Sequence, residues 1–497
     1  MDTLHALGGG LGAILTTGNL YYCLIGSIVG TLIGVLPGIG PLAAMSLLMP
    51  ATFTLSPVAS IAMLSSMFYG AMYGGSTTSI LVNIPGEAAS VVTCMDGHQM
   101  ARQGRAGAAL GMAAIGSFVA GTVSLVLLTL FSPALADMAL RFGPPEYCAL
   151  MLLGLVCTLL MIEGSAAKGM VMIALGFLFG AIGLDTVNGR ERLTFGSVDL
   201  TAGMDLVAVI IGLFGISEIL LNVEQRIANE VVGQRIRKLL PTVADWAASW
   251  KPMLRGTGLG FLLGVVPGGG PVTASFVSYA VERRVARDPS RFGRGAIEGV
   301  AGPESANNAA VASGMIPLLT LGLPGNAVTA LLMGALVIQG VQPGPTMITQ
   351  HADVFWGVVA SMYVGNVFLL LLNLPLIGLW VQLLRVPYPV LFPAVLLLAV
   401  VGTYGANKNF FDLWVMLGFG VAGYVLRKFQ YEMAPLVLAL VLAPLLEQSL
   451  RQSLVMSGGG AGIFVSRPIA AGLFALSLAI AAAIVVRKFK PVGDKQP

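Results

Sequence analysis

Long stretches without a charged side chain limit this chain to the membrane. Residues 3–86 contain no Asp, Glu, Lys or Arg, and neither do residues 305–352. A helix needs about 20 mostly apolar residues to cross a bilayer, so each stretch can hold more than one crossing. Only 10% of the 497 residues are charged, whereas soluble domains usually carry about 25%. The composition predicts an all-α polytopic membrane protein in the lipid bilayer, with about a dozen transmembrane helices.

Two nearly identical phrases interrupt the apolar sequence. GTLIGVLPGIGP occupies residues 30–41, and GFLLGVVPGGGP occupies residues 260–271. Proline removes a backbone N–H and glycine tolerates a non-helical turn, so both phrases predict a discontinuous helix that stops and restarts. Each half contains a second break, in GGSTTSILVNIPGEA at 74–88 and in GMIPLLTLGLPGNA at 314–327. Four breaks in two matched pairs predict an internal repeat.

The charges around the two phrases predict their orientations. No Lys or Arg precedes the first phrase, whereas the second lies between a basic connection at 226–255 and a run of arginines at 283–294. The positive-inside rule places both basic segments in the cytoplasm. We therefore expect two inverted-topology repeats. Residues 256–280 are expected to form a re-entrant hairpin with arms of about 11 residues, too short to cross; one long kinked crossing is the alternative.

A single integral membrane domain is expected over residues 1–497. The basic tail RKFKPVGDKQP places the C-terminus in the cytoplasm. The expected parts are a first repeat core at 20–135, a basic cytoplasmic connection at 226–255, a second repeat core at 256–385, and C-terminal helices with the tail at 389–497.

The breaks are the predicted ligand sites. A restarted helix presents free N–H groups and about half a positive charge, so it can hold a carboxylate. The C-terminal ends and unwound carbonyls suit a hard cation such as Na⁺. Small polar side chains beside the breaks either bind these ligands or form interhelical contacts worth about 0.6 kcal/mol each. The residues predicted to bind substrate are Ser76, Thr77, Thr78, Asn83, Pro85, Gly86, Asn307, Asn308, Pro324, Gly325 and Asn326. Those predicted to bind the cation are Pro37, Gly38, Gly40, Pro267, Gly268, Gly270 and Thr320.

Few acidic residues lie near the breaks, and no catalytic motif accompanies them. Glu87 is interpreted as a helix cap, while Glu298 and Glu304 either serve a cation or proton or lie at the membrane interface. The three histidines and four cysteines lack metal-type spacing, and no nucleotide-binding motif occurs. The sequence therefore predicts neither an enzyme nor a cofactor. The net charge of +4 resides in short interhelical segments, which argues against nucleic acid as a partner.

Four long motifs surround the breaks: GVLPGIGPLAAMSLLMPATF, FYGAMYGGSTTSILVNIPGEAASVVTCMDGHQMARQGRAGAALG, FGRGAIEGVAGPESANNAA and PLLTLGLPGNAVTALLMGALVIQGVQPGP. They resemble the large membrane subunit of the bacterial tripartite tricarboxylate transporters, the TctA-type proteins. The resemblance implies a multi-pass subunit in the inner membrane that works with a small membrane subunit and a periplasmic solute-binding protein. Such systems import citrate or another organic carboxylate by symport with Na⁺ or H⁺. A passive anion channel and a scaffold that does not itself transport are the alternatives.

Overall fold

The computed structural model describes residues 3–36, 40–139, 141–160, 165–185, 189–225, 239–266, 270–344, 346–383 and 388–489. The described chain is helical apart from two short antiparallel strands, β1 (Gly183–Leu184) and β2 (Glu191–Arg192). The all-α expectation is confirmed. The chain divides into two compact units: unit 1 is Met1–Ala136 with Val207–Tyr424, and unit 2 is Asp137–Leu206 with Val425–Pro497.

The first part of unit 1 contains the first pair of breaks. α2 ends inside the first phrase, at Val35, and α3 restarts with Pro41 at its first position, where a missing N–H costs nothing. α4 ends at Asn83, a left-handed residue with φ 59°. The elements are α1 (Thr3–Ile14), α2 (Thr17–Val35), α3 (Pro41–Leu48), the 3-10 helix η1 (Met49–Thr52), α4 (Pro57–Val82), the 3-10 helix η2 (Ala88–Ser90), α5 (Val91–Arg102) and α6 (Ala106–Ala139), which ends in unit 2.

The second part of unit 1 repeats this order around the second pair of breaks. α12 restarts with Pro271, and α13 ends at Gly322, which is left-handed with φ 69°. The elements are α9 (Leu206–Ile210), the π-helix η4 (Ile211–Ile216), α10 (Ser217–Gln225), α11 (Val243–Val265), α12 (Pro271–Val285), η5 (Pro289–Arg291), α13 (Glu298–Leu321), α14 (Ala327–Ile338), α15 (Met347–Gln350), α16 (Ala352–Asn373), α17 (Ile377–Leu383), α18 (Tyr388–Asn407) and α19 (Phe410–Lys428).

One arm of the predicted hairpin is longer than expected. α11 has 23 residues and α12 has 15, so the expectation of two arms of about 11 residues is wrong. The reason is a capping box in which Thr242 accepts from the N–H of Asp245 and the Asp245 carboxylate accepts from Thr242. This cap starts α11 inside the segment that the sequence assigned to the basic connection.

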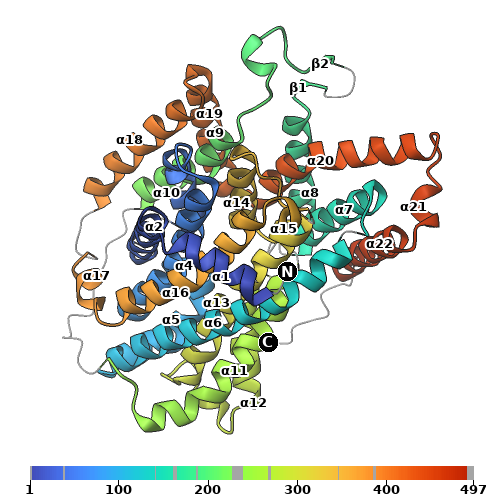
Figure 1. The fold of residues 1–497 in the computed structure, drawn as a ribbon. Helices are drawn as coiled ribbons and strands as arrows, with labels where there is room; N and C mark the ends of the chain where they lie inside the picture. Colours follow the sequence, from blue (N-terminus) through green and yellow to red (C-terminus); the bar gives the residue numbers. More distant parts are fainter. Residues whose placement is uncertain are drawn as a thin grey trace. The chain divides into compact units, whose positions relative to one another are not determined.

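Two pairs of helices in unit 1 pack along columns of glycine. α2 lies against α4, and α11 lies against α13 (Figure 1). In the first pair a Cβ on Gly26, Gly30 or Gly34 would lie 2.2, 2.3 and 2.3 Å from the carbonyl oxygens of Met63, Met67 and Ala71. In the second pair a Cβ on Gly256, Gly260 or Gly264 would lie 2.2, 2.1 and 2.4 Å from those of Gly302, Ala306 and Ala310. Both contacts advance in four-residue steps in the same direction, so the helices of each pair run parallel and touch backbone to backbone.

A helix from each part, α6 of the first and α16 of the second, packs on the long helix of the other part. Gly365 of α16 faces the Ser66 hydroxyl of α4, and Gly116 of α6 faces the Ser305 hydroxyl of α13. The first contacts of the two glycine columns lie at Met63 of α4 and at Gly302 of α13. Ser66 and Ser305 each follow three residues later, so they occupy matching positions. The two contacts are therefore alike, and the inverted-topology repeat itself stays a prediction. The opposite orientation of the two parts in the membrane stays a prediction.

The long helices α4 and α13 form the interior of unit 1. Almost all their residues are buried, although both contain hydroxyl or amide side chains. Among the described residues, the helices long and apolar enough to cross a membrane are five: α2, α6 over Ala106–Ala134, α16, α19 and α20 (Ala434–Met456). Several shorter apolar helices accompany them. The chain is thus a multi-pass membrane protein.

Unit 2 is a smaller helical group. α20 packs on α7 and α8, and α22 packs on α7. Arg467 Nε donates to Glu146 Oε1 at 2.6 Å, and Asp185 lies between Arg192 and Arg451. In these contacts α7 spans Pro144–Leu160, α8 spans Ala166–Gly180 and α22 spans Pro468–Phe489. Unit 2 also contains η3 (Val198–Leu200) and α21 (Ile463–Ser466).

Candidate functional site

The two breaks of the first part meet at the end of α2. The Thr78 hydroxyl donates to the carbonyl oxygens of Gly34 at 3.2 Å and Gly75 at 3.1 Å. A Cβ on Gly86 would lie 2.0 Å from the Gly34 oxygen, so only glycine fits there. The contact joins the C-terminus of α2 to the last turns of α4 and the second break, about forty residues or more further along the sequence.

The second part has a looser version of this contact. A Cβ on Gly314 would lie 3.6 Å from the Gly264 oxygen, and a Cβ on Gly325 would lie 3.9 Å from the same oxygen. Both distances are ordinary van der Waals separations. The ends of α11 and α13 therefore meet as those of α2 and α4 do, but with room for a methyl group.

A buried carboxyl group joins the two parts. Glu304 of α13 has no exposed surface. One carboxyl oxygen accepts from Ser76 Oγ at 2.6 Å and from Asn307 Nδ2 at 3.3 Å, and the other accepts from the Thr93 hydroxyl. Ser76 and Asn307, both predicted ligand residues, thus meet at an acidic side chain.

Asn308 extends this polar cluster to α6. Its side-chain amide donates to Ser117 Oγ at 2.7 Å, to the Glu304 carbonyl at 3.1 Å and to Asn307 Oδ1. The Asn308 side-chain oxygen has no hydrogen-bond partner among the described residues. Buried polar atoms are usually satisfied, so an unpaired oxygen here marks a place for a water or a ligand.

A small cavity adjoins the cluster. Its volume is about 10 Å³, room for about one water molecule, and its wall contains Ser76, Thr77 and Ser117. Ser76 therefore faces both the cavity and Glu304. The lining residues come from α4, α6, α16 and α17: Tyr73, Ser76, Thr77, Leu110, Ala113, Ala114, Ser117, Asn373 and Ile377.

Other predicted ligand residues shape the breaks through local contacts. Asn83 is the exposed left-handed end of α4, and Asn326 caps α14 by accepting from the Thr329 N–H at 2.9 Å. Thr320 donates to the Ile316 carbonyl one turn earlier, at 2.7 Å. Pro85 is half-buried at the first break, and Pro324 is buried at the second.

The predicted cation site lies mostly outside the described residues. Pro37, Gly38, Pro267 and Gly268 belong to the undescribed tips of the two phrases, and only the following residues, Gly40 and Gly270, are described. Gly40 has an ordinary φ of −66°, whereas Gly270 has φ 42°. In the described part of the chain, no group of three His, Cys, Asp or Glu side chains could hold a metal ion. The cation site stays a prediction.

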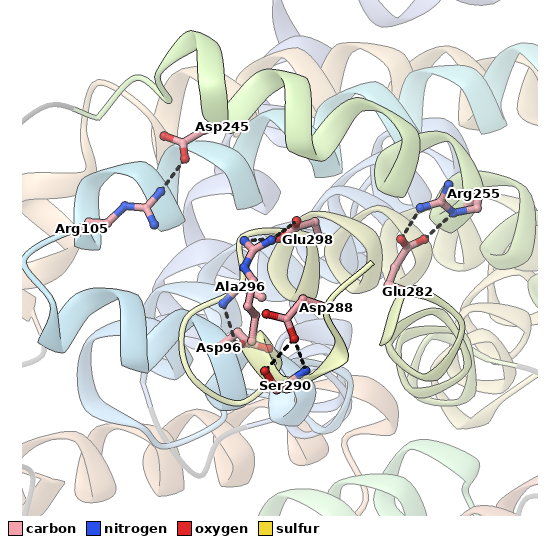
Figure 2. Close-up of polar contacts among 10 residues, drawn as sticks. Asp96, Arg105, Asp245, Arg255, Glu282, Asp288, Ser290, Ala296 and Glu298 are labelled. Atoms are coloured by element: carbon pink, nitrogen blue, oxygen red, sulfur yellow. Dashed lines mark hydrogen bonds and ion pairs between the residues drawn. The ribbon is translucent and has the colours of Figure 1, made fainter. Parts of the chain in front are cut away.

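A second buried carboxylate fastens α5 to the loop before α13. Asp96 Oδ1 accepts from the backbone N–H of Ala296 at 2.8 Å (Figure 2). The same oxygen accepts from the N–H groups of Gly293 at 2.9 Å and Gly295 at 2.8 Å, and Oδ2 accepts from Tyr279 Oη at 2.9 Å. This carboxylate is fully hydrogen-bonded and thus has a structural role.

Ion pairs surround this loop (Figure 2). Arg105 pairs with Asp245, and Arg255 binds the buried Glu282 carboxylate through two guanidinium nitrogens. In the same loop, hydrogen bonds from the Ser290 hydroxyl and N–H hold the pKa of Asp288 below its usual value. Asp245 and Glu282 each have an arginine partner, whereas Glu304 is held by hydroxyl and amide groups.

Sequence reasoning left two members of the cluster out of the site. For Glu304 the sequence left two interpretations open, a role in binding a cation or proton and a position at the membrane interface. The structure buries the residue completely. Thr93 received no role because it lies on α5, beyond the break. Glu87 was interpreted as a cap, which is confirmed: its carboxylate accepts from the Ala89 N–H at 2.6 Å. The signal for Glu304 was its position one turn before the Asn307–Asn308 pair.

Interrupted helices that hold polar groups beside a small cavity, in a chain of apolar helices, are typical of membrane transport proteins. The chain belongs to the tripartite tricarboxylate transporter TctA family, whose model matches residues 20–438. Over 495 residues it is 49% identical to an uncharacterized 52.8 kDa protein in the TAR-I ttuC' 3' region of Agrobacterium vitis, covering 100% of this chain and 99% of that protein. Over 219 residues it is 54% identical to an uncharacterized protein in the TAR-II ttuC' 3' region of the same organism, covering 44% of this chain and 90% of that protein. No solved structure matches.

Family membership confirms the resemblance. It makes this chain the large subunit of a tripartite tricarboxylate transporter, and proteins of this family work with a small membrane subunit and a periplasmic binding protein. The role is therefore transport across a membrane.

Proposed function

We propose that this subunit forms the path by which an organic di- or tricarboxylate, such as citrate, enters the cell by symport with Na⁺ or H⁺. The observation that carries the proposal is the cavity beside Ser76 and Thr77, which adjoins the cluster where both halves of unit 1 meet. Discontinuous helices place binding sites at such a junction, because their free backbone groups need a polar partner inside the membrane.

Energetics support coupling to a cation. Moving one negative charge into a cell against 100 mV costs about 2.3 kcal/mol, and a dianion costs twice as much. Co-transported cations cancel this charge. In the proposed arrangement the substrate contacts hydroxyl and amide groups from Ser76 to Gly86 and from Asn307 to Asn326, and the phrases from Pro37 to Gly40 and from Pro267 to Gly270 bind the cation.

Reconstitution tests the proposal. The chain, its small membrane subunit and its binding protein are placed in proteoliposomes of inner-membrane lipid, and uptake of labelled carboxylates is measured with an imposed Na⁺ gradient, an imposed pH gradient, or neither. Accumulation that needs both the binding protein and a cation gradient supports the symporter. Conduction without the binding protein or a gradient identifies a channel, and full transport by the partners without this chain identifies a scaffold.

A further inference from the structure

Glu304 is a buried carboxyl group without a cationic partner. No Lys or Arg among the described residues forms an ion pair or hydrogen bond with it. Glu282, which is as deeply buried, has Arg255 as its partner, and Asp96 has three backbone N–H groups. An ionised carboxylate in a dry interior is strongly unfavourable without such compensation. A bound proton or other cation would offset this cost.

Glu87 supplies a second, independent observation at the same place. It is only 7% exposed, and its Oε1 atom has no hydrogen-bond partner in the described part of the chain. Its Cγ atom would lie 2.8 Å from a Cβ on Gly75, the neighbour of Ser76. The two carboxyl groups are close enough for the charge of Glu304 to act on Glu87. Two like charges in one dry site disfavour simultaneous ionisation, so a proton between them relieves the repulsion.

The other titratable groups around Glu304 do not provide the missing charge. Tyr73 on α4 and Cys94 on α5 interact with its charge and are neutral when protonated. One turn earlier on α13, Gly302 faces Glu282 with its Arg255 partner, and Gly299 faces Asp96 with its Tyr279 partner. His98 on α5 directs Nδ1 to the Ile80 carbonyl at 3.1 Å. On the next turn of α13, the neutral Asn307 donates to the Glu304 carboxyl group, and the neutral Ser117 of α6 contacts Asn308.

Ser76 connects Glu304 to the cavity. Its Oγ atom donates to Glu304 at 2.6 Å, and the residue also lines the cavity. A hydroxyl group can donate one hydrogen bond while it accepts another. A proton entering the cavity as hydronium can thus reach the carboxylate: the Ser76 O–H proton passes to Glu304 and the hydronium proton replaces it. One O–H bond forms on Glu304, one breaks on hydronium, and water remains.

We propose that Glu304 is the proton-binding site of the transporter, with Ser76 as its connection to the cavity and with Thr93 and Asn307 holding the carboxyl group in place. The proposal rests on the proposed function for its role in transport, specifies H⁺ as the coupling ion, and places the coupling site at Glu304 instead of at the two Pro-Gly phrases. Because Ser76 and Thr93 come from the first part and Glu304 and Asn307 from the second, protonation would change the contact between the two parts.

Infrared spectroscopy of the purified full-length chain in lipid tests the site with the proton alone as ligand. The parent is expected to show a protonated-carboxyl stretching band that appears and disappears reversibly with pH. Glu304→Gln should lack it. Glu298→Gln is the matched control, since it removes an acid paired with Arg291 on the same helix, and should retain it.

The spectra can overturn the proposal in three ways. A band that is unchanged in Glu304→Gln belongs to another residue. A parent spectrum that responds to Na⁺ and not to pH identifies a metal-cation site. If Glu304→Gln does not fold, Ser76→Ala decides: it removes one hydrogen bond from Glu304 and should shift the band, and an unshifted band contradicts the geometry.

Transport then tests the coupling. In proteoliposomes with both partner subunits, the ratio of uptake with an inward proton gradient to uptake without one should exceed one for the parent and fall to one for Glu304→Gln. A variant ratio equal to the parent's would mean that Glu304 carries no coupled proton. If the parent transports nothing under any gradient, the proposed function fails, and the infrared result still decides the proton site.

Discussion

The segments α2–α5 and α11–α14 have similar backbones but different side chains. Both pack two helices along a glycine column, end the long helix in a left-handed residue, and begin the next helix with a capping box. Their polar groups differ. In α13 the cluster contains Glu304, Asn307 and Asn308, and the matching positions of α4 hold Ser65, Phe68 and Tyr69. The comparison teaches that the framework occurs twice, while a carboxyl group on the long helix itself belongs to one copy.

The two segments also differ at their junctions, the places where the end of the first helix meets the second break: Gly34 with Gly86 in one segment, and Gly264 with Gly325 in the other. The first is closed around Gly86, and the second leaves space at Gly325. The caps differ in charge, because Glu87 begins η2 where Asn326 begins α14. An anion is therefore more easily accommodated at the second junction, which lacks a fixed carboxylate.

The largest expected effect tests what the two segments share. Gly30→Ala and Gly260→Ala each place a methyl group about 2 Å from a backbone oxygen of the partner helix. Overpacking of this kind costs about 3 kcal/mol, so both variants should lose most of their folded protein. Yield and thermal unfolding in detergent measure the effect. Gly258→Ala, which points into open space on α11, should behave like the parent; equal behaviour of all three would reject the glycine columns.

The junctions should respond differently to the same change. Gly86→Ala should destabilise the protein by about 2 kcal/mol, somewhat less than the helix variants because the break can shift. Gly325→Ala should cost little, since its Cβ would lie 3.9 Å from the Gly264 oxygen. Thermal unfolding of the two variants side by side provides the measurement. Equal losses would show that the second junction is as closed as the first.

A smaller effect is expected at Asn308 of α13 and at Tyr69, the residue at the matching position of α4. Asn308→Ala removes hydrogen bonds to Ser117 and to the Glu304 carbonyl, which should cost about 1.5 kcal/mol and impair uptake. Tyr69→Phe, at the matching position of α4, removes a buried hydroxyl without a partner among the described residues and should be neutral. Unfolding and uptake are measured for both. Normal uptake by Asn308→Ala would reduce the amide to a packing role.

The smallest expected effect concerns the residues that follow the two phrase tips. Gly270→Ala should cost about 1 kcal/mol, because φ 42° with ψ 169° suits only glycine. Gly40→Ala should cost almost nothing, since its φ is −66° and no atom lies within 4 Å of its Cβ. A stability difference between the two variants, measured by thermal unfolding, is the result to look for; its absence would mean that α12 starts with an ordinary backbone.

The breaks could be predicted from the sequence because proline and glycine act locally. α3 and α12 begin at the prolines of the two phrases, and α4 and α13 end just before the second breaks. The start of α11 was missed, although Thr242 and Asp245 form a capping box, because the basic residues around it favoured a connection.

The cluster around Glu304 could not be derived from the sequence. A helix that is buried on every side has no polar face, so its pattern does not tell which residues meet a partner. α4 and α13 are both of this kind. The contact between Ser76 and Glu304 joins residues more than two hundred positions apart, and only the folded arrangement of three helices selects it.

The glycine columns also restrict how the protein can move. A slide of one residue between α2 and α4 would bring Ile33 or Val35 against a carbonyl that now faces the bare Cα of Gly34. The next register that again offers glycine lies four residues away, a step of about 6 Å along the helix. Intermediate registers are sterically blocked, and glycine has no rotamer that could make room. The two helices of each pair therefore cannot slide past each other and must move as one rigid body. Bending is then confined to the segments that connect the pairs.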